Sequence, residues 1–251
     1  GHLFMTSLDR TAVYEFDLAG NVVDVIDLST YGTGATGLAF SPTGRLFVAI
    51  NMGSRLLGLN PEGVVASDLS AQTPGGPTGM TIGPLGDFFI SSPSNLSVVR
   101  LRSDGVHQGF LGVGSVSNPQ GVAFLPSGNF VVGCAGASPL PSITLDDITT
   151  MDYDLPGTLH GDVAIGPGGA LYFSQIGGGL SFTSITTPSI ASIALAGSNS
   201  SGIAFGPDNR IYVKQYSGLD DVLVYSSSGT VLDTFTPAPA TAGEGYLAFS
   251  P

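Results

Sequence analysis

The chain has 251 residues, of which 10% are charged, and its seven Lys and Arg against nineteen Asp and Glu give a formal net charge of −12. It contains no basic run that could follow a phosphate backbone, so nucleic acid is not an expected partner. Hydrophobic residues make up 42% of the chain, too large a share for a disordered protein, and no apolar stretch reaches the ~18 residues of a membrane span. We therefore expect a globular protein with a mostly neutral, polar surface and no membrane insertion.

A proline recurs every 40 to 44 residues along the chain. These residues are Pro42, Pro84, Pro126, Pro167, Pro207 and Pro251. Each follows a short strand of alternating small and large apolar residues, and after five of them a second strand begins four residues later, which predicts a hairpin. Two further strands complete most units. Four strands in a repeat of about 42 residues are typical of a propeller blade.

The first 28 residues supply three expected strands, at 2–7, 12–17 and 21–28. Five fuller blades follow, at about 36–70, 78–112, 120–155, 161–197 and 201–236. The last segment, 245–251, holds an inner strand at 246–250 with no second strand after it. We therefore predict that strand 246–250 pairs with strand 2–7. This pairing closes one all-β domain of six blades with four antiparallel strands each, and closure removes free sheet edges.

Three segments carry a likeness to known repeats: NMGSRLLGLNPEG, PTGMTIGPLGDFFIS and PQGVAFLPSGNFVVG. They resemble NHL repeats, and six such blades resemble the propellers of the gluconolactonase (SMP-30) and streptogramin-lyase group. The resemblance implies metal ligands where each inner strand begins, beside the central channel. The matching positions here are Thr36, Thr78, Gln120, His160 with Asp162, Ser201 and Glu244. Thr, Gln and Ser take four of the six places, so no complete set of metal ligands is evident.

Three residues at these places are candidates for chemistry. Glu244 has no acidic neighbour within ten residues, and its carboxylate could hold a divalent cation, act as a general base, or be a solvated loop charge. His160 and Asp162 combine an imidazole and a carboxylate, which suits acid/base catalysis or a partial metal site, or an ordinary loop hydrogen bond. Glu244, Asp162 and His160 are therefore the candidate ligands for Ca²⁺, Mg²⁺ or Zn²⁺ and the candidate catalytic residues.

Gln120 and Lys214 are the candidate substrate-binding residues. Sister blades place small residues where Lys214 stands, so its amine is expected to reach the channel and meet an anionic substrate, or Glu244 in a structural ion pair. Lys214 is the only lysine, and the chain is rich in Gly. The start lacks the charged and apolar regions of a signal peptide. We expect the mature part of an extracellular or cell-surface protein.

Two functions remain open. The first is a secreted or cell-surface propeller that works as a binding or structural module, taking a protein or small-molecule ligand at a propeller face, with self-association also open. The second is a metal-dependent hydrolase or lyase, lactonase-like, with its site in the central channel. Scarce catalytic residue types and low charge favour the first.

Overall fold

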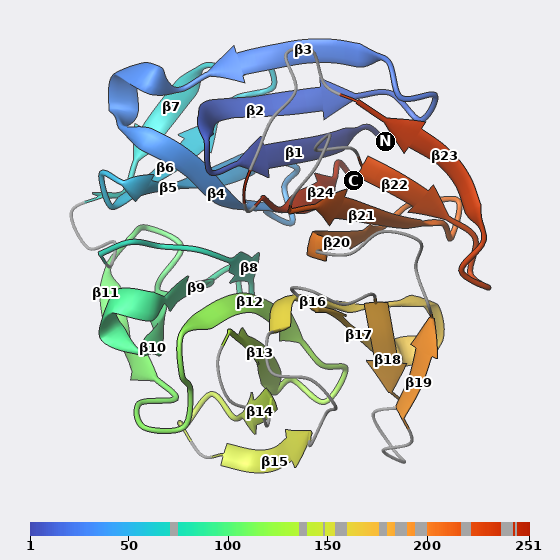
Figure 1. Cartoon of the computed structure of the whole chain (residues 1–251). Helices are drawn as coiled ribbons and strands as arrows, with labels where there is room; N and C mark the ends of the chain where they lie inside the picture. Colours follow the sequence, from blue (N-terminus) through green and yellow to red (C-terminus); the bar gives the residue numbers. More distant parts are fainter. Residues whose placement is uncertain are drawn as a thin grey trace.

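The computed structural model describes residues 1–70, 75–135, 140–147, 149–153, 160–175, 180–183, 190–193, 200–216, 222–236, 243 and 245–251. The chain is all-β, with six four-stranded antiparallel sheets in a ring (Figure 1). Helical structure in the described residues is limited to 3₁₀ turns at Ser29–Tyr31, Pro93–Asn95 and Pro167–Gly169. The all-β class and the six blades predicted from the sequence are confirmed. No helix of the described residues is long and apolar enough to cross a membrane.

Five blades are continuous in sequence, and each runs from an inner strand at the axis to an outer strand at the rim. The first two are β4 (Thr33–Phe40), β5 (Leu46–Met52), β6 (Arg55–Leu59), β7 (Val65–Asp68), and β8 (Met80–Ile82), β9 (Phe88–Ser92), β10 (Ser97–Leu101), β11 (His107–Leu111). The third is β12 (Pro119–Phe124), β13 (Phe130–Cys134), β14 (Leu140–Ile143), β15 (Thr149–Tyr153). The last two are β16 (His160–Ile165), β17 (Leu171–Gln175), β18 (Leu180–Thr183), β19 (Ile190–Ile193), and β20 (Ser200–Phe205), β21 (Ile211–Gln215), β22 (Val222–Tyr225), β23 (Val231–Phe235).

The sixth blade is built from both ends of the chain. It contains β24 (Leu247–Phe249), β1 (Leu3–Ser7), β2 (Arg10–Phe16) and β3 (Val22–Asp27). β1 and β24 pair antiparallel, with Leu3 opposite Phe249 and Met5 opposite Leu247. The pairing is extended by a hydrogen bond from the Thr6 amide to the Tyr246 carbonyl, 3.0 Å long. The two labelled ends of the chain accordingly lie close together (Figure 1).

The recurring proline marks one repeated turn. In three blades the residue two places after the proline is a glycine with a positive φ, a conformation that glycine adopts at no steric cost. These glycines are Gly44, Gly86 and Gly128. The amide of each donates to the carbonyl three residues earlier, at 2.9 Å in all three blades. The turn fixes where the second strand starts relative to the inner strand of the same blade.

Aromatic pairs join neighbouring blades. They are Phe4–Phe40 (5.1 Å between ring centroids), Phe47–Phe88 (4.7 Å), Phe89–Phe124 (4.8 Å), Tyr172–Phe205 (4.8 Å) and Tyr212–Phe249 (4.8 Å). All five are edge-to-face contacts, each worth roughly 0.5–1.5 kcal/mol beyond area burial. Between blades β12–β15 and β16–β19 the contact is mainly aliphatic, around Leu125, Val131 and Leu171. The bulky side chains therefore lie between blades, which leaves the small ones for the axis.

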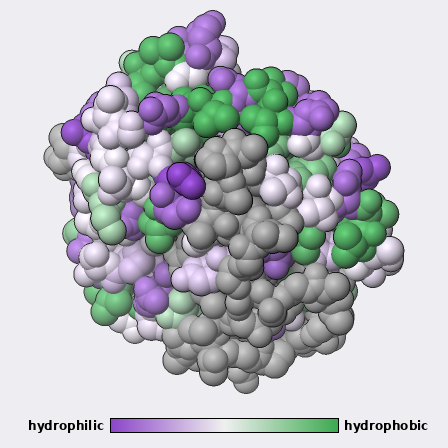
Figure 2. Space-filling view, turned by 45° about the horizontal axis from the view of Figure 1, so that its top comes forward, coloured by the Kyte–Doolittle hydropathy of each residue, from purple (hydrophilic) through white to green (hydrophobic). Residues whose placement is uncertain are grey.

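The outer strands expose apolar residues. Val22, Val23 and Val25 of β3 and Val231 and Leu232 of β23 are each more than a third exposed. Asp24 and Asp27 stand among these apolar residues of β3, and charges on an edge strand discourage further strand pairing. Figure 2 shows hydrophobic residues interspersed with hydrophilic ones over the coloured part of one face.

Candidate axial binding site

Six corresponding residues lie near the axis, in the inner strands or directly before them. They are Gly37, Gly79, Gly121, Asp162, Gly202 and Tyr246, and the residue after each one pairs with the second strand of its own blade. Four blades carry glycine there, and two carry a large polar side chain. In four inner strands the pairing register shifts just before or at this point, and such bulges turn side chains away from the regular alternation. We call these six positions the axial ring.

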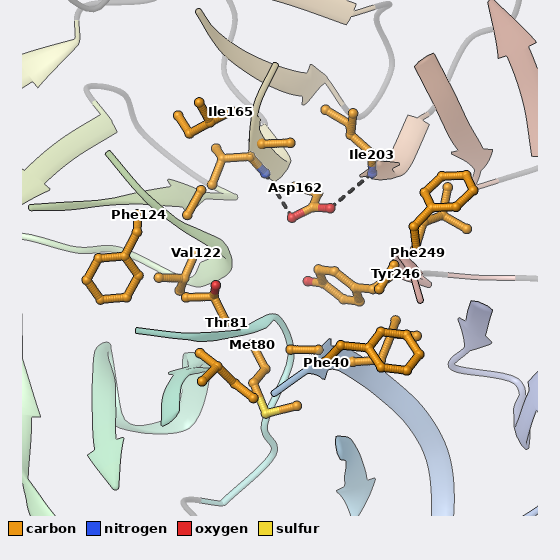
Figure 3. Close-up of a pocket in the computed structure, with 18 residues that line it drawn as sticks. Phe40, Met80, Thr81, Val122, Phe124, Asp162, Ile165, Ile203, Tyr246 and Phe249 are labelled. Atoms are coloured by element: carbon orange, nitrogen blue, oxygen red, sulfur yellow. Dashed lines mark hydrogen bonds between the residues drawn. The ribbon is translucent and has the colours of Figure 1, made fainter. Parts of the chain in front are cut away.

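Beyond the axial ring the channel widens into a cavity. Residues two places further along each strand face the same way. They are Ala39, Thr81, Ala123, Ala164, Ala204 and Ala248. The cavity has a volume of about 420 Å³ and is lined by inner-strand residues (Figure 3). Its lining is apolar except for Thr81, Asp162 and Tyr246.

Asp162 is held at the cavity wall by backbone groups of two blades. Its Oδ1 accepts a hydrogen bond from the Val163 amide (2.9 Å), and its Oδ2 accepts one from the Ile203 amide of the next blade (3.0 Å). Its own amide donates to Ser174 Oγ at 2.7 Å. A Cβ on Gly121 would lie 2.3 Å from Asp162 Oδ1, so the carboxylate occupies space that glycine leaves free.

The electrostatics of Asp162 are those of a buried acid without a counter-ion. Its side chain is 7% exposed, and it forms no ion pair within the described structure. Burial raises its pKa to about 7, although the two amide donors act in the opposite direction. An ionised carboxylate offers about four acceptor positions, and the described residues occupy two of them. Asp162 therefore has hydrogen-bonding capacity left on a cavity wall.

Tyr246 shares the cavity with Asp162. Its side chain is buried, and Figure 3 shows its hydroxyl and the Asp162 carboxylate pointing into the same space. Tyr246 is a residue that sequence reasoning missed, although a signal was present. Counting five residues back from each of the six turn prolines reaches the axial ring, where Asp162 and Tyr246 interrupt a series of glycines.

The side chains of the other two candidate metal ligands, His160 and Glu244, are not among those that the structure describes. His160 has its backbone in β16, opposite Gln175, and its side chain lies outside the described residues, as does all of Glu244. The described residues contain no group of three His, Cys, Asp or Glu suited to a metal ion. A divalent cation held by Glu244, His160 and Asp162 therefore stays a prediction.

Gln120 and Lys214 lie outside the lining of the cavity. The Gln120 Nε2 donates to Asn118 Oδ1 at 3.3 Å, and its buried Oε1 has no hydrogen-bond partner among the described residues. Lys214 is fully buried, and its Nζ donates to the carbonyls of Gln215 (3.2 Å) and Gly243 (3.4 Å). The structure therefore does not bring these two together with Asp162 in the cavity, and their role in substrate binding stays a prediction.

Comparisons with known proteins define the class. No family model and no curated protein matches the sequence. Among solved structures, a chain of the nidogen/laminin complex is similar with a TM-score of 0.81 and 14% identity, over 99% of this chain and 98% of that one. A protein of unknown function from Bacteroides caccae has a TM-score of 0.79 at 11% identity, over 98% of both chains. A streptogramin B lyase has a TM-score of 0.69 at 16% identity, over 95% of this chain and 74% of that one.

At these identities the likeness concerns the fold alone. The chain is a β-propeller, and it resembles the streptogramin B lyase and nidogen/laminin structures in the arrangement of its six blades. A lyase and a protein complex share this architecture, so the fold does not choose between catalysis and binding.

Proposed function

We propose that this propeller is a binding module that takes a compact, mostly apolar ligand group into the axial cavity. The cavity itself carries the proposal: its volume of about 420 Å³ matches a small-ligand site, and its described lining combines mostly apolar side chains with the three polar ones of Thr81, Asp162 and Tyr246. A binding site needs a few oriented polar groups on a rigid wall. Asp162, fixed by amides from two blades, supplies one.

Binding is favoured over turnover by what lines the cavity. Asp162 and Tyr246 are the titratable side chains of the lining, and both carboxylate oxygens of Asp162 already accept backbone hydrogen bonds. Acid/base catalysis usually draws on groups with different protonation states that meet the reacting atoms from separate positions. The nidogen/laminin structure, similar over almost the whole of both chains, is a complex between proteins and supports a role in recognition.

We also propose that the protein is secreted or lies at the cell surface. The support is compositional: a single lysine and a low share of charged residues. Fractionation of the source cells with an antibody against this chain tests the location. Recovery in the cytosolic fraction alone would contradict it.

The binding proposal is tested by screening a library of small compounds by ligand-observed NMR. Three proteins are compared: the parent, Ala164→Leu, which fills part of the cavity, and Ala19→Leu, a matched change at an exposed turn. Compounds that bind the parent and Ala19→Leu but not Ala164→Leu support the axial site. Compounds that bind all three proteins equally contradict it.

An activity screen with lactones and simple esters tests the rival function in the same samples. It is run with calcium, magnesium, zinc or a chelator. Rapid turnover that requires a divalent cation would replace the binding module by a metal-dependent hydrolase or lyase.

A further inference from the structure

Among the charged side chains that the structure describes, Asp162 is buried without a partner of opposite charge. Ion pairs with an aspartate are formed by Arg10, Arg55, Arg100, Arg102 and Arg210. The described donors to the Asp162 carboxylate are two backbone amides. Buried carboxylates are normally paired because transfer of an unpaired charge out of water is costly. The missing partner at Asp162 therefore points to a cation supplied by a ligand.

The surroundings of Asp162 fit a particular kind of cation. The oxygens of Thr81 and Tyr246 lie in the same lining, and the remaining walls are apolar. An ammonium group has three donors and no acceptor, which suits a carboxylate with two acceptor positions left and hydroxyl oxygens nearby. The Tyr246 ring offers an aromatic surface, which also attracts cations.

We propose that the axial cavity recognises a protonated primary amine on a short apolar stem, with the ammonium donating to Asp162. The proposal rests on the proposed binding function and names the ligand class. The stem would contact apolar side chains of the lining, including Val122, Ala123 and Ala164. The same chemistry occurs in a free alkylamine and in a lysine side chain presented by a protein partner.

Anions are disfavoured at this site. The described residues of the lining include no basic side chain, and the whole chain carries a net charge of −12. The only buried amine of the described residues near the axis is Lys214, whose ammonium is bound to backbone carbonyls outside the cavity lining. A ligand carboxylate would meet repulsion from Asp162, whereas an ammonium would stabilise its charged form.

Calorimetry with three probes of equal shape tests the ligand class: cyclohexylmethylamine, cyclohexylmethanol and cyclohexanecarboxylate. The parent should bind the amine about tenfold or more tightly than the alcohol, the usual size of a hydrogen bond to a charged group. Asp162→Asn should remove this preference. Asp233→Asn is the matched control, because Asp233 also accepts the amide of the following residue (2.8 Å) but lies exposed on β23.

Two further arms identify the source of the amine. Nα-acetyl-lysine methylamide and its norleucine counterpart represent a lysine on a protein surface. Binding of the lysine compound but not of the free amine assigns a protein ligand, and the reverse assigns a small molecule.

Equal affinity of the parent for amine and alcohol would overturn the amine proposal and leave the binding function standing, without reliance on any variant. The amine proposal would also be overturned if no probe binds the parent, while other compounds bind the parent and fail to bind Ala164→Leu. Tighter binding of cyclohexanecarboxylate than of the amine would contradict the expected preference of the site for a cation.

Discussion

Two adjacent positions of the inner strands use polar side chains in different ways. Just before the axial ring, Thr36 Oγ1 donates to the Pro77 carbonyl (2.9 Å) and Thr78 Oγ1 to the Pro119 carbonyl (3.0 Å). Both bonds reach the next blade, so these hydroxyls are used in holding the ring together. At the axial ring, Asp162 also bonds to the next blade but keeps acceptor positions facing a cavity.

The difference separates structural from functional polarity. A buried polar side chain whose hydrogen-bonding groups are all bonded to the backbone has a structural role, because it helps to hold the fold together. A buried carboxylate without a counter-ion costs stability, and it is found where a ligand supplies the missing charge or where chemistry needs a shifted pKa. Thr36 and Thr78, which the family resemblance suggested as site positions, have such a structural role. Asp162 combines both.

The largest expected effect comes from breaking the ring at the closing blade. Deletion of residues 245–251 removes β24 and exposes the inner edge of β1. The truncated chain should lose cooperative unfolding and associate through the free edge. Thermal unfolding and light scattering measure both. A truncated chain that stays monomeric and keeps the parent melting temperature would contradict closure as a source of stability.

The second effect is the pH dependence that Asp162 gives to folding. Its folded pKa of about 7 lies above the unfolded value, so below pH ~4 both states are protonated and the group contributes nothing. As the pH rises from about 4 to 7, only the unfolded state ionises, and stability should fall by up to about 1.4 kcal/mol per unit, with no further loss above 7.

Asp162→Asn removes this loss. The difference in unfolding free energy between parent and variant should therefore change in favour of the variant between pH 4 and 7, and denaturant titrations at several pH values measure it. Asp233→Asn provides the control. A parent and an Asp162→Asn variant whose stability curves run parallel over this range would show that Asp162 is not a raised-pKa acid.

A smaller effect is expected at the glycine beside Asp162. In Gly121→Ala the new Cβ would meet Asp162 Oδ1 at 2.3 Å and the Val163 amide nitrogen at 2.7 Å, so backbone must move. Such overpacking typically costs about 1–3 kcal/mol. Gly75→Ala is the control, since a Cβ there has nothing within 4 Å. Equal melting temperatures of the two variants would show that the axial ring needs no glycine at this place.

The sequence predicts the repeat better than it predicts the site. A proline every 40 to 44 residues and alternating small and large apolar residues were enough for the six blades, because turn and strand chemistry are local. The site depends on what the ring brings together. His160 and Asp162 were grouped because they are close in sequence, yet the register shift after His160 and the Ile203 amide of the next blade place Asp162 at the cavity wall.

Burial explains the rest of the gap. The raised pKa of Asp162 comes from burial in the folded ring, which no single strand reveals. Tyr246 looked like an ordinary strand residue, since an aromatic residue beside apolar ones is common in a β-strand. Its correspondence to glycine in four other blades becomes visible only when the repeats are aligned on their turns.

The most direct test is an NMR titration of the Asp162 carboxyl carbon, without ligand and with saturating cyclohexylmethylamine. The account predicts a pKa of about 7 for the free protein and a clearly lower pKa in the complex, because a bound ammonium favours the ionised carboxylate. An unchanged pKa in the presence of the amine, or an ordinary aspartate pKa in both samples, would contradict the assignment of the axial cavity as an amine-binding site.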